Sequence, residues 1–270
     1  MYCELKGAKT VEKALDVPSP DIVVEALKKA LETHQAYDVI TLTANGEPTL
    51  YPELKSVIEK IKALQYDAKL LILSNGSTIA DPCIQEMLSH LDIVKLSLDC
   101  ATQKCFRKLD RPHKTISLER IIEGMRAFRK RYQGELIIEV LVVAGINDSE
   151  EEFKALKEVL QSIAPNRIDI GTIDRPPAYK VQGVSIEKLV ELSQCLEGLH
   201  VAIAYKKNYA NTKQNFSEEA IFEMLERRPQ SFEDVAYMFD EESLVRLNVL
   251  LEKEKINVRK VAGVSFYTTH

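Results

Sequence analysis

Short apolar runs alternate with amphipathic stretches from residue 38 to residue 205, and this alternation constrains the fold more than any other feature. A short apolar run is typical of a buried strand, and apolar residues spaced three and four apart are typical of a helix lying on a sheet. Strand, helix and strand again predicts βαβ units and a parallel sheet. The predicted strands are 38–43, 69–74, 92–98, 135–143, 167–173 and 200–205.

Helical patterns precede and separate these runs, and they fit either an open α/β barrel or a doubly wound sheet. Charges within the strands favour the barrel. Alternation places Lys95, Ser97 and Asp99 on one face of a strand, and Glu139 lies inside the next strand. A doubly wound sheet buries both faces, where such charges are costly unless paired, whereas a barrel interior lets them meet across strands. The alternative is that Lys95 lies at a strand margin and reaches solvent. The predicted helices are 19–33, 52–65, 82–90, 117–132, 149–162 and 185–196.

The pattern changes after residue 215. Three helical segments, 217–229, 231–239 and 241–255, precede a predicted β-hairpin at 256–268, an order typical of a winged helix-turn-helix. We therefore predict an α/β domain at 1–207, a linker at 208–215 and a winged-helix-like domain at 216–270. The last segment has seven Lys and Arg against eleven Asp and Glu, a net charge of −4. DNA binding needs clustered cations, so we expect a protein-interaction or packing module instead.

Composition limits the cellular locations in which we expect the protein to function. The net charge of −5 mixes both signs, and no apolar run approaches the roughly 18 residues that span a bilayer. With no secretion signal, the five cysteines are expected to be reduced thiols, and a cytoplasmic location follows. Cys83 and Cys195 fall in helical patterns and are expected to be small core residues, and Cys105 is expected to be structural.

Polar residues gather where the predicted strands end, which is where parallel α/β folds place their chemistry. Any one of them alone is more typical of a cap or a turn. Several consecutive strands ending this way favour a polar ligand above the sheet. The residues concerned include Gly46, Glu47, Asn75, Ser97, Asp99 and Asn147.

Several of these strand ends resemble those of the radical S-adenosylmethionine superfamily. "ITLTANGEPTLYPEL" is similar to a strand and loop of these enzymes, and "LILSNGS", "VKLSLDC" and "VVAGINDSEEEF" are similar to the strands that follow. "CFRKLDRPH" and "DIGTIDRPPAY" resemble a bacterial and archaeal branch of iron–sulfur oxidoreductases related to wybutosine-type tRNA enzymes. The resemblance implies an α/β fold, a partial (open) parallel β/α barrel that here lacks its first strand.

The resemblance also implies cofactors and a reaction. In this superfamily a C-x3-C-x2-C motif holds a [4Fe-4S] cluster, which reductively cleaves S-adenosyl-L-methionine to a 5′-deoxyadenosyl radical, with electrons from a flavodoxin-type or ferredoxin-type reductant. Tyr2 and Cys3 resemble the last two positions of the motif, which makes Cys3 a metal ligand and Tyr2 an adenine neighbour. The first two cysteines are absent, so the chain begins within the motif, and we expect it not to hold the cluster in the standard way.

The resemblance assigns the remaining cofactor contacts to strand ends. Glu47 would receive the ammonium group of S-adenosylmethionine, with Gly46 allowing close backbone approach, and Asn75 would help hold the methionine end. Ser97 and Asp99 would meet the ribose hydroxyls. The alternatives are a helix N-terminal residue for Glu47 and an N-cap for Ser97 or Asp99.

Asn147 would lie near adenine by the same resemblance. The sequence does not identify the substrate, which could be a small molecule or RNA. Two other functions stay open: a non-catalytic protein that binds a nucleoside or S-adenosylmethionine, and a winged-helix regulator that senses a small ligand. An open edge at the first predicted strand further predicts a homodimer, because unpaired edges invite pairing.

Overall fold

The computed structural model describes residues 17–32, 37–44, 46–173, 179–203, 213–227, 229–261 and 264–269. Tyr2 and Cys3 lie outside these ranges, as does most of the predicted linker. The chain divides into two compact units. One contains the six-stranded sheet with its helices, and the other contains the C-terminal helices with a small sheet.

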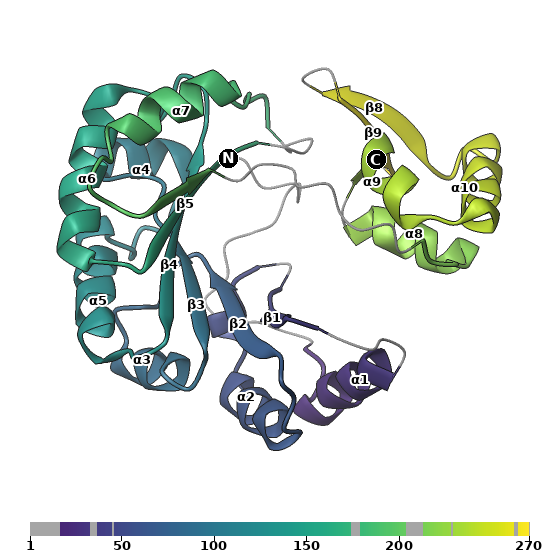
Figure 1. The fold of residues 1–270 in the computed structure, drawn as a ribbon, viewed down its shortest axis with the longest axis horizontal. Coiled ribbons are helices and arrows are strands. Elements are labelled where there is room, and N and C mark those ends of the chain that lie inside the picture. Colours follow the sequence, from purple (N-terminus) through teal and green to yellow (C-terminus); the bar gives the residue numbers. More distant parts are fainter. Residues whose placement is uncertain are drawn as a thin grey trace. The chain divides into compact units, whose positions relative to one another are not determined.

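The six strands pair in sequence order and run parallel throughout, which confirms the predicted parallel α/β sheet (Figure 1). The described strands form an open, curved sheet rather than a closed barrel. The first strand lies at one edge and the sixth at the other. The strands are β1 (Val39–Leu42), β2 (Lys69–Ser74), β3 (Ile93–Ser97), β4 (Glu135–Val142), β5 (Arg167–Thr172) and β6 (Val201–Ile203).

Helices cover one face of this sheet (Figure 1). Alternate side chains of β4, namely Leu136, Ile138, Val140 and Val142, are completely buried beneath them. Burial of these side chains supplies the main driving force for this layer. The helices and one 3₁₀ turn are α1 (Pro20–Glu32), η1 (Pro48–Leu50), α2 (Leu54–Ala63), α3 (Pro82–Leu88), α4 (Gln103–Leu109), α5 (Leu118–Arg131), α6 (Glu150–Ile163) and α7 (Ile186–Gln194).

The opposite face of the sheet carries a network of charges. Lys95 Nζ lies 2.7 Å from a Glu139 oxygen and 3.0 Å from an Asp169 oxygen. Arg167 Nε donates to Asp169 at 2.7 Å and extends the network along β5. The prediction that these charges meet across strands is confirmed. The alternative is wrong, because Lys95 lies on the third of six strands and its side chain is only 18% exposed.

The pKa shifts of Lys95 and Asp169 each have opposing causes. Burial alone would lower the pKa of Lys95, but Glu139 and Asp169 outweigh it and raise that pKa. Burial would likewise raise the pKa of Asp169, but hydrogen bonds from Arg167 and Lys95 outweigh it and lower that pKa. The network therefore favours the ionised forms of Lys95 and Asp169.

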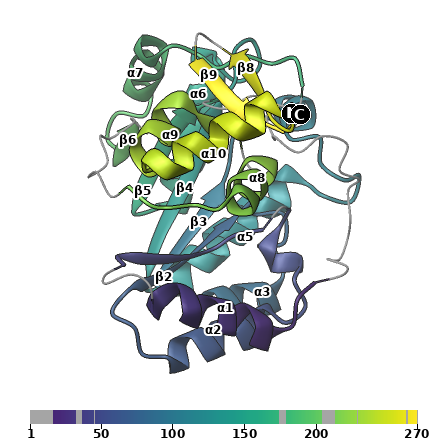
Figure 2. The same ribbon diagram turned by 90° about the vertical axis from the view of Figure 1, so that its right-hand side faces the viewer.

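The C-terminal unit has its own hydrophobic core, formed by Ile221, Leu225, Val235, Phe239, Leu247, Leu250 and Ile256. All three predicted helices and the predicted hairpin are present, and a short additional strand joins the hairpin (Figure 2). Ser231 and Asp234 form a capping box at the start of the helix 232–238. The elements are α8 (Glu218–Arg227), β7 (Gln230–Ser231), α9 (Phe232–Met238), α10 (Glu241–Glu252), β8 (Asn257–Val261) and β9 (Val264–Thr268).

Three sequence predictions need correction. The helix α4 was not predicted, because it has only seven residues and a mostly polar sequence. Cys100 and Cys105 form a disulfide, so the prediction of five reduced thiols is wrong. Cys83 is exposed rather than part of the core. Among the described residues, no helix is both long and apolar enough to cross a membrane.

Candidate functional site

The buried carboxylate of Glu47 joins two loops at the carboxyl ends of β1 and β2. Its Oε1 accepts hydrogen bonds from the Thr49 amide at 3.0 Å, the Thr49 hydroxyl at 2.6 Å and the Ser74 hydroxyl at 2.8 Å. Its Oε2 accepts from the Asn75 amide at 2.7 Å. The side chain is 9% exposed, so these donors replace the water that a carboxylate would otherwise need.

These contacts settle the local role of Glu47. It caps η1 by accepting from the Thr49 amide, as the helix N-terminal alternative predicted. It also holds the loop after β2, a contact between residues 27 and 28 positions apart that no local pattern predicts. The ammonium contact stays a prediction. Among the described residues Oε2 accepts from one donor, the Asn75 amide, so it is the oxygen with more remaining acceptor capacity.

The glycines on either side of this carboxylate differ. Gly76 has a φ of +71°, and a Cβ there would lie 2.9 Å from the Met125 side chain, so the turn itself requires glycine. A Cβ on Gly46 would meet no atom of the described residues within 4 Å. Within this part of the chain, Gly46 is therefore compatible with the predicted close approach of a ligand to the backbone.

Asp99 and Asn147 join the carboxyl ends of β3 and β4 in a second buried cluster. Asp99 Oδ1 accepts from the Leu141 amide at 2.7 Å. The Asn147 amide nitrogen donates to the carbonyl oxygens of Asp99 at 2.8 Å and Leu141 at 2.9 Å, and its oxygen accepts from the Val143 amide at 2.7 Å. These bonds lock the two strand ends together.

Burial limits what these two side chains can offer a ligand. Asn147 is completely buried, so a ligand would meet the backbone around it and not its amide group. Its proximity to adenine stays a prediction. Asp99 is 3% exposed, and its carboxylate accepts from a strand amide, so the N-cap alternative is wrong for this residue. Thr102 caps α4 instead.

The remaining predicted contacts, Ser97 and Asn75, are more accessible. Ser97 ends β3 and pairs in register with Glu139. Asn75 is exposed, and its Oδ1 accepts from the Ser77 amide at 2.9 Å. Strand order places β3 beside β2, so Asn75 and Ser97 follow neighbouring strands at the same edge of the sheet. The ribose and methionine contacts assigned to them stay predictions.

Glu152 holds the loop that follows Asp99. Its Oε1 accepts from the amides of Ala101 at 2.7 Å and Thr102 at 3.0 Å, and its Oε2 accepts from the Thr102 hydroxyl at 2.8 Å. The Cys100–Cys105 disulfide closes the same loop. The sequence did not predict this role of Glu152, because its partners lie about 50 residues away. An acidic residue in the first turn of a helix is also common, since it interacts favourably with the helix dipole.

The described residues do not fit a three-thiolate cluster site. The only group of three or more metal-binding side chains among them is Cys100, Cys105 and Glu152. Two of its members are joined to each other as a disulfide, and one is a carboxylate. Cys83 and Cys195 are not part of this group. The fifth cysteine, Cys3, lies outside the described residues.

Comparison with known proteins identifies the family to which this open parallel sheet belongs. Residues 1–159 match the radical SAM superfamily, and the chain belongs to this superfamily. It is 37% identical to a "UPF0026 protein" of Helicobacter pylori strain J99, over 99% of this chain and 87% of that protein.

Two solved structures share the fold. A radical SAM methyltransferase from Sphaerobacter thermophilus superposes with a TM-score of 0.57 at 17% identity, covering 70% of this chain and 57% of that one. Streptococcus suis SuiB bound to S-adenosylmethionine superposes with a TM-score of 0.58 at 16% identity, covering 76% of this chain and 47% of that one. At these identities the likeness shows the fold alone, and the chain spans about half the length of these two proteins.

Proposed function

We propose that this chain carries the S-adenosylmethionine-binding edge of a radical SAM enzyme that acts on an unidentified substrate. The proposal rests on hydrogen bonds that connect neighbouring loops at the carboxyl edge of the sheet. Glu47 connects the loops after β1 and β2, and Asn147 connects those after β3 and β4. Membership of the superfamily supports the chemistry. The enzyme class that we propose with it is a radical SAM oxidoreductase.

The chain's own residues bind and orient the cofactor in this proposal. Glu47 holds the loop after β2 through the Asn75 amide, and Gly46, whose added Cβ would meet no described atom within 4 Å, lets the methionine end approach the backbone. Ser97 and Asp99 face the ribose. When bound and reduced, the [4Fe-4S] cluster of the superfamily supplies the electron that cleaves the sulfonium. The described residues do not fit that cluster, so we expect this chain alone not to assemble it in the standard way.

A Gly46→Ala variant tests the binding site separately from the fold. No atom of the residues that the structure describes lies within 4 Å of the added methyl group, so we expect the midpoint of urea unfolding to be unchanged. We expect isothermal calorimetry with S-adenosylmethionine to show weaker binding than in the wild type, because the methyl group occupies the space that the ligand needs. Equal binding by both proteins would contradict this placement of the cofactor.

Anaerobic reconstitution with iron and sulfide tests the cluster. We expect no broad visible absorbance from the chain as it stands, since the sequence lacks the first two cysteines of the motif. Stoichiometric iron and sulfide would overturn this expectation and would require thiolate ligands other than the standard three.

The alternative is a non-catalytic protein that binds a nucleoside or S-adenosylmethionine. The absence of a three-thiolate group among the described residues favours it. Binding of S-adenosylmethionine without any 5′-deoxyadenosine formation, under reducing conditions and with cluster present, would support this alternative. The cytoplasmic location, the homodimer and the protein-interaction role of the C-terminal unit are proposals that rest on the sequence.

A further inference from the structure

Four cations lie close together on the helix α4 and at its end. The stretch 103–111 contains four Lys and Arg against one Asp, a net charge of +3 in a chain whose net charge is −5. Three of the cations are spaced three or four residues apart within α4, so they share one face of the helix, and the fourth follows its C-cap. All four side chains are exposed. This α4 cation cluster consists of Lys104, Arg107, Lys108 and Arg111.

The opposite side of α4 attaches the cluster to the carboxyl edge of the large sheet. Cys105 forms the disulfide with Cys100, which directly follows Asp99. Lys108 Nζ donates to the carbonyl oxygen of Gly145, in the loop after β4, at 2.9 Å. The cluster is therefore connected to the loops after both β3 and β4, which are the two loops that the proposed cofactor site uses at this part of the edge.

The cations on the face of α4 have no counter-charge in the part of the chain that the structure describes. No ion pair joins Lys104, Arg107 or Lys108 to a described carboxylate. By contrast, the exposed Lys154 and Lys188 lie 3.0 Å and 2.7 Å from carboxylate oxygens of their own helices. Like charges three or four residues apart repel each other, so the cluster weakens α4. An anionic partner would remove this repulsion.

Arg111 has a backbone conformation that is rare for its residue type. Its φ is +48°, in the left-handed region that favours glycine, and Pro112 follows it. Arg111 directly follows the C-cap of α4, a position at which glycine is common because it adopts this conformation without strain. The end of the helix alone would therefore favour glycine. The guanidinium group, rather than the backbone, accounts for an arginine at this position.

The surroundings of the cluster distinguish between kinds of anionic partner. Protein interfaces and membrane surfaces bind through exposed apolar side chains as well as through charges. No large apolar side chain is exposed among the described residues between 98 and 131. Phosphate groups bind Arg and Lys without such anchors, and a nucleic-acid backbone offers several phosphates in a row. A base within a duplex is out of reach of an active site, which favours an unpaired loop, the form in which RNA exposes its bases.

We propose that the α4 cation cluster binds the phosphate backbone of an RNA, and that an unpaired loop of this RNA is the substrate at the neighbouring edge of the sheet. The role of the RNA as substrate rests on the proposed function, whereas the binding of its phosphates does not. Arg107 and Arg111 each offer a fork of donors that fits phosphate oxygens, and Lys104 adds a point charge. The disulfide and the bond to Gly145 hold α4, so the cations are in place before the RNA arrives.

Fluorescence anisotropy with a labelled RNA hairpin that has an unpaired loop tests this binding in the full chain. The variant Lys104→Gln/Arg107→Gln removes two cations of the cluster. The control Lys62→Gln/Lys130→Gln removes two exposed lysines from the last turns of α2 and α5, which precede the starts of β2 and β4. Each phosphate contact to a single strand contributes about 0.7 to the slope of log affinity against log salt concentration.

We expect this slope to fall by about 1.4 in the cluster variant, with roughly 20-fold weaker binding at about 100 mM KCl. We expect the control to bind as the wild type does. All four replaced side chains are exposed, so the urea midpoints of both variants should equal that of the wild type. Equal binding of the RNA by the two variants overturns the proposal. Should the double variant fail to fold, Lys104→Gln alone, with an expected slope change of about 0.7, decides in the same way.

Two further ligands test the identity of the partner. A DNA hairpin of the same sequence should bind more weakly than the RNA, and equal affinity overturns the assignment to RNA. Poly-glutamate that displaces the RNA at an equal concentration of charge overturns phosphate recognition and assigns the cluster to an acidic protein. Calorimetry with S-adenosylmethionine separates this proposal from the proposed function. Binding of RNA without S-adenosylmethionine overturns the proposed function and leaves the cluster, and binding of S-adenosylmethionine without RNA overturns the role of the cluster alone.

Discussion

Replacing Lys95 by methionine removes the one cation that joins β3 to both β4 and β5. Methionine keeps the unbranched shape, so the change is mainly electrostatic. Glu139 is 43% exposed and regains water, and Asp169 keeps the hydrogen bonds from Arg167. Breaking a fully buried ion pair costs about 3–5 kcal/mol, and the residual solvent access lowers our expectation to about 2 kcal/mol of unfolding free energy.

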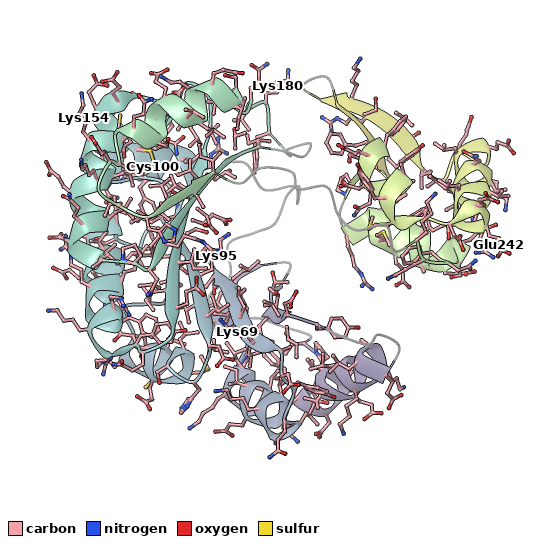
Figure 3. The ribbon with its side chains drawn as sticks, viewed as in Figure 1. Lys69, Lys95, Cys100, Lys154, Lys180 and Glu242 are labelled. Atoms are coloured by element: carbon pink, nitrogen blue, oxygen red, sulfur yellow. A yellow bond between two sulfur atoms is a disulfide. The ribbon has the colours of Figure 1, made fainter. Side chains whose placement is uncertain are left out.

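The matched control is Lys154→Met (Figure 3). Lys154 Nζ also lies 3.0 Å from a carboxylate, that of Glu150, but its side chain is 65% exposed on the outer helix α6. An exposed pair of this kind contributes about 0.5 kcal/mol or less. Urea unfolding at neutral pH, extrapolated linearly to water, measures both variants. Equal losses in the two variants would show that the network on the sheet is solvated and would refute the reasoning.

The pH dependence of the Lys95→Met effect provides a second check. The pKa of Asp169 is lowered in the folded protein, so its ionised form contributes stability above its unfolded pKa. This contribution is lost as the pH falls through the folded pKa. We therefore expect the difference between wild type and Lys95→Met to shrink in acid. A difference that stays constant down to the acid transition would assign the effect to packing instead.

Three further changes test other contacts. In Glu47→Gln, an amide NH2 group replaces one oxygen that accepts from protein donors. We expect the free energy of unfolding, measured with urea, to fall by about 1–3 kcal/mol. An unchanged urea midpoint would mean that water reaches this carboxylate. Replacing both Cys100 and Cys105 by serine removes the disulfide, and we expect the free energy of unfolding to fall by about 2 kcal/mol. A reducing agent should lower the stability of the wild type but not that of the variant. Equal stability of the variant and the oxidised wild type would contradict the disulfide. In Gly124→Ala, the new methyl group would lie 2.8 Å from the Ala80 backbone nitrogen. We expect the free energy of unfolding to fall by about 1–3 kcal/mol, whereas the control Gly46→Ala should leave it unchanged.

Periodicity predicted the sheet well, because a buried strand needs an apolar run that can be read locally. Each of the six predicted strands is present with its ends shifted by at most a few residues. The same periodicity placed Lys95 on one face of its strand, and the cost of burying charge favoured a fold in which Lys95 and Glu139 meet across strands, as they do. The predictions that the structure confirms are those that concern neighbouring strands.

Contacts between distant loops could not be predicted. The bonds that hold Asp99 and Thr102 in place come from Asn147 and Glu152, which lie about 48 and 50 residues further along the chain. The helix α4 depends on such a loop, since its seven residues are too few to form a helix from propensity alone. The disulfide was not predicted, because the spacing of its two cysteines matches no recognised disulfide pattern.

The three hydrogen bonds of Asn147 have a consequence for the timing of ligand binding. A loop that is ordered before the ligand arrives loses little conformational entropy when the ligand binds, and it needs no slow rearrangement before contact. The ends of β3 and β4 are tied together by a completely buried side chain, so they behave as a single rigid platform. Association at this part of the edge should therefore proceed at a rate set by diffusion and orientation, with a single kinetic phase.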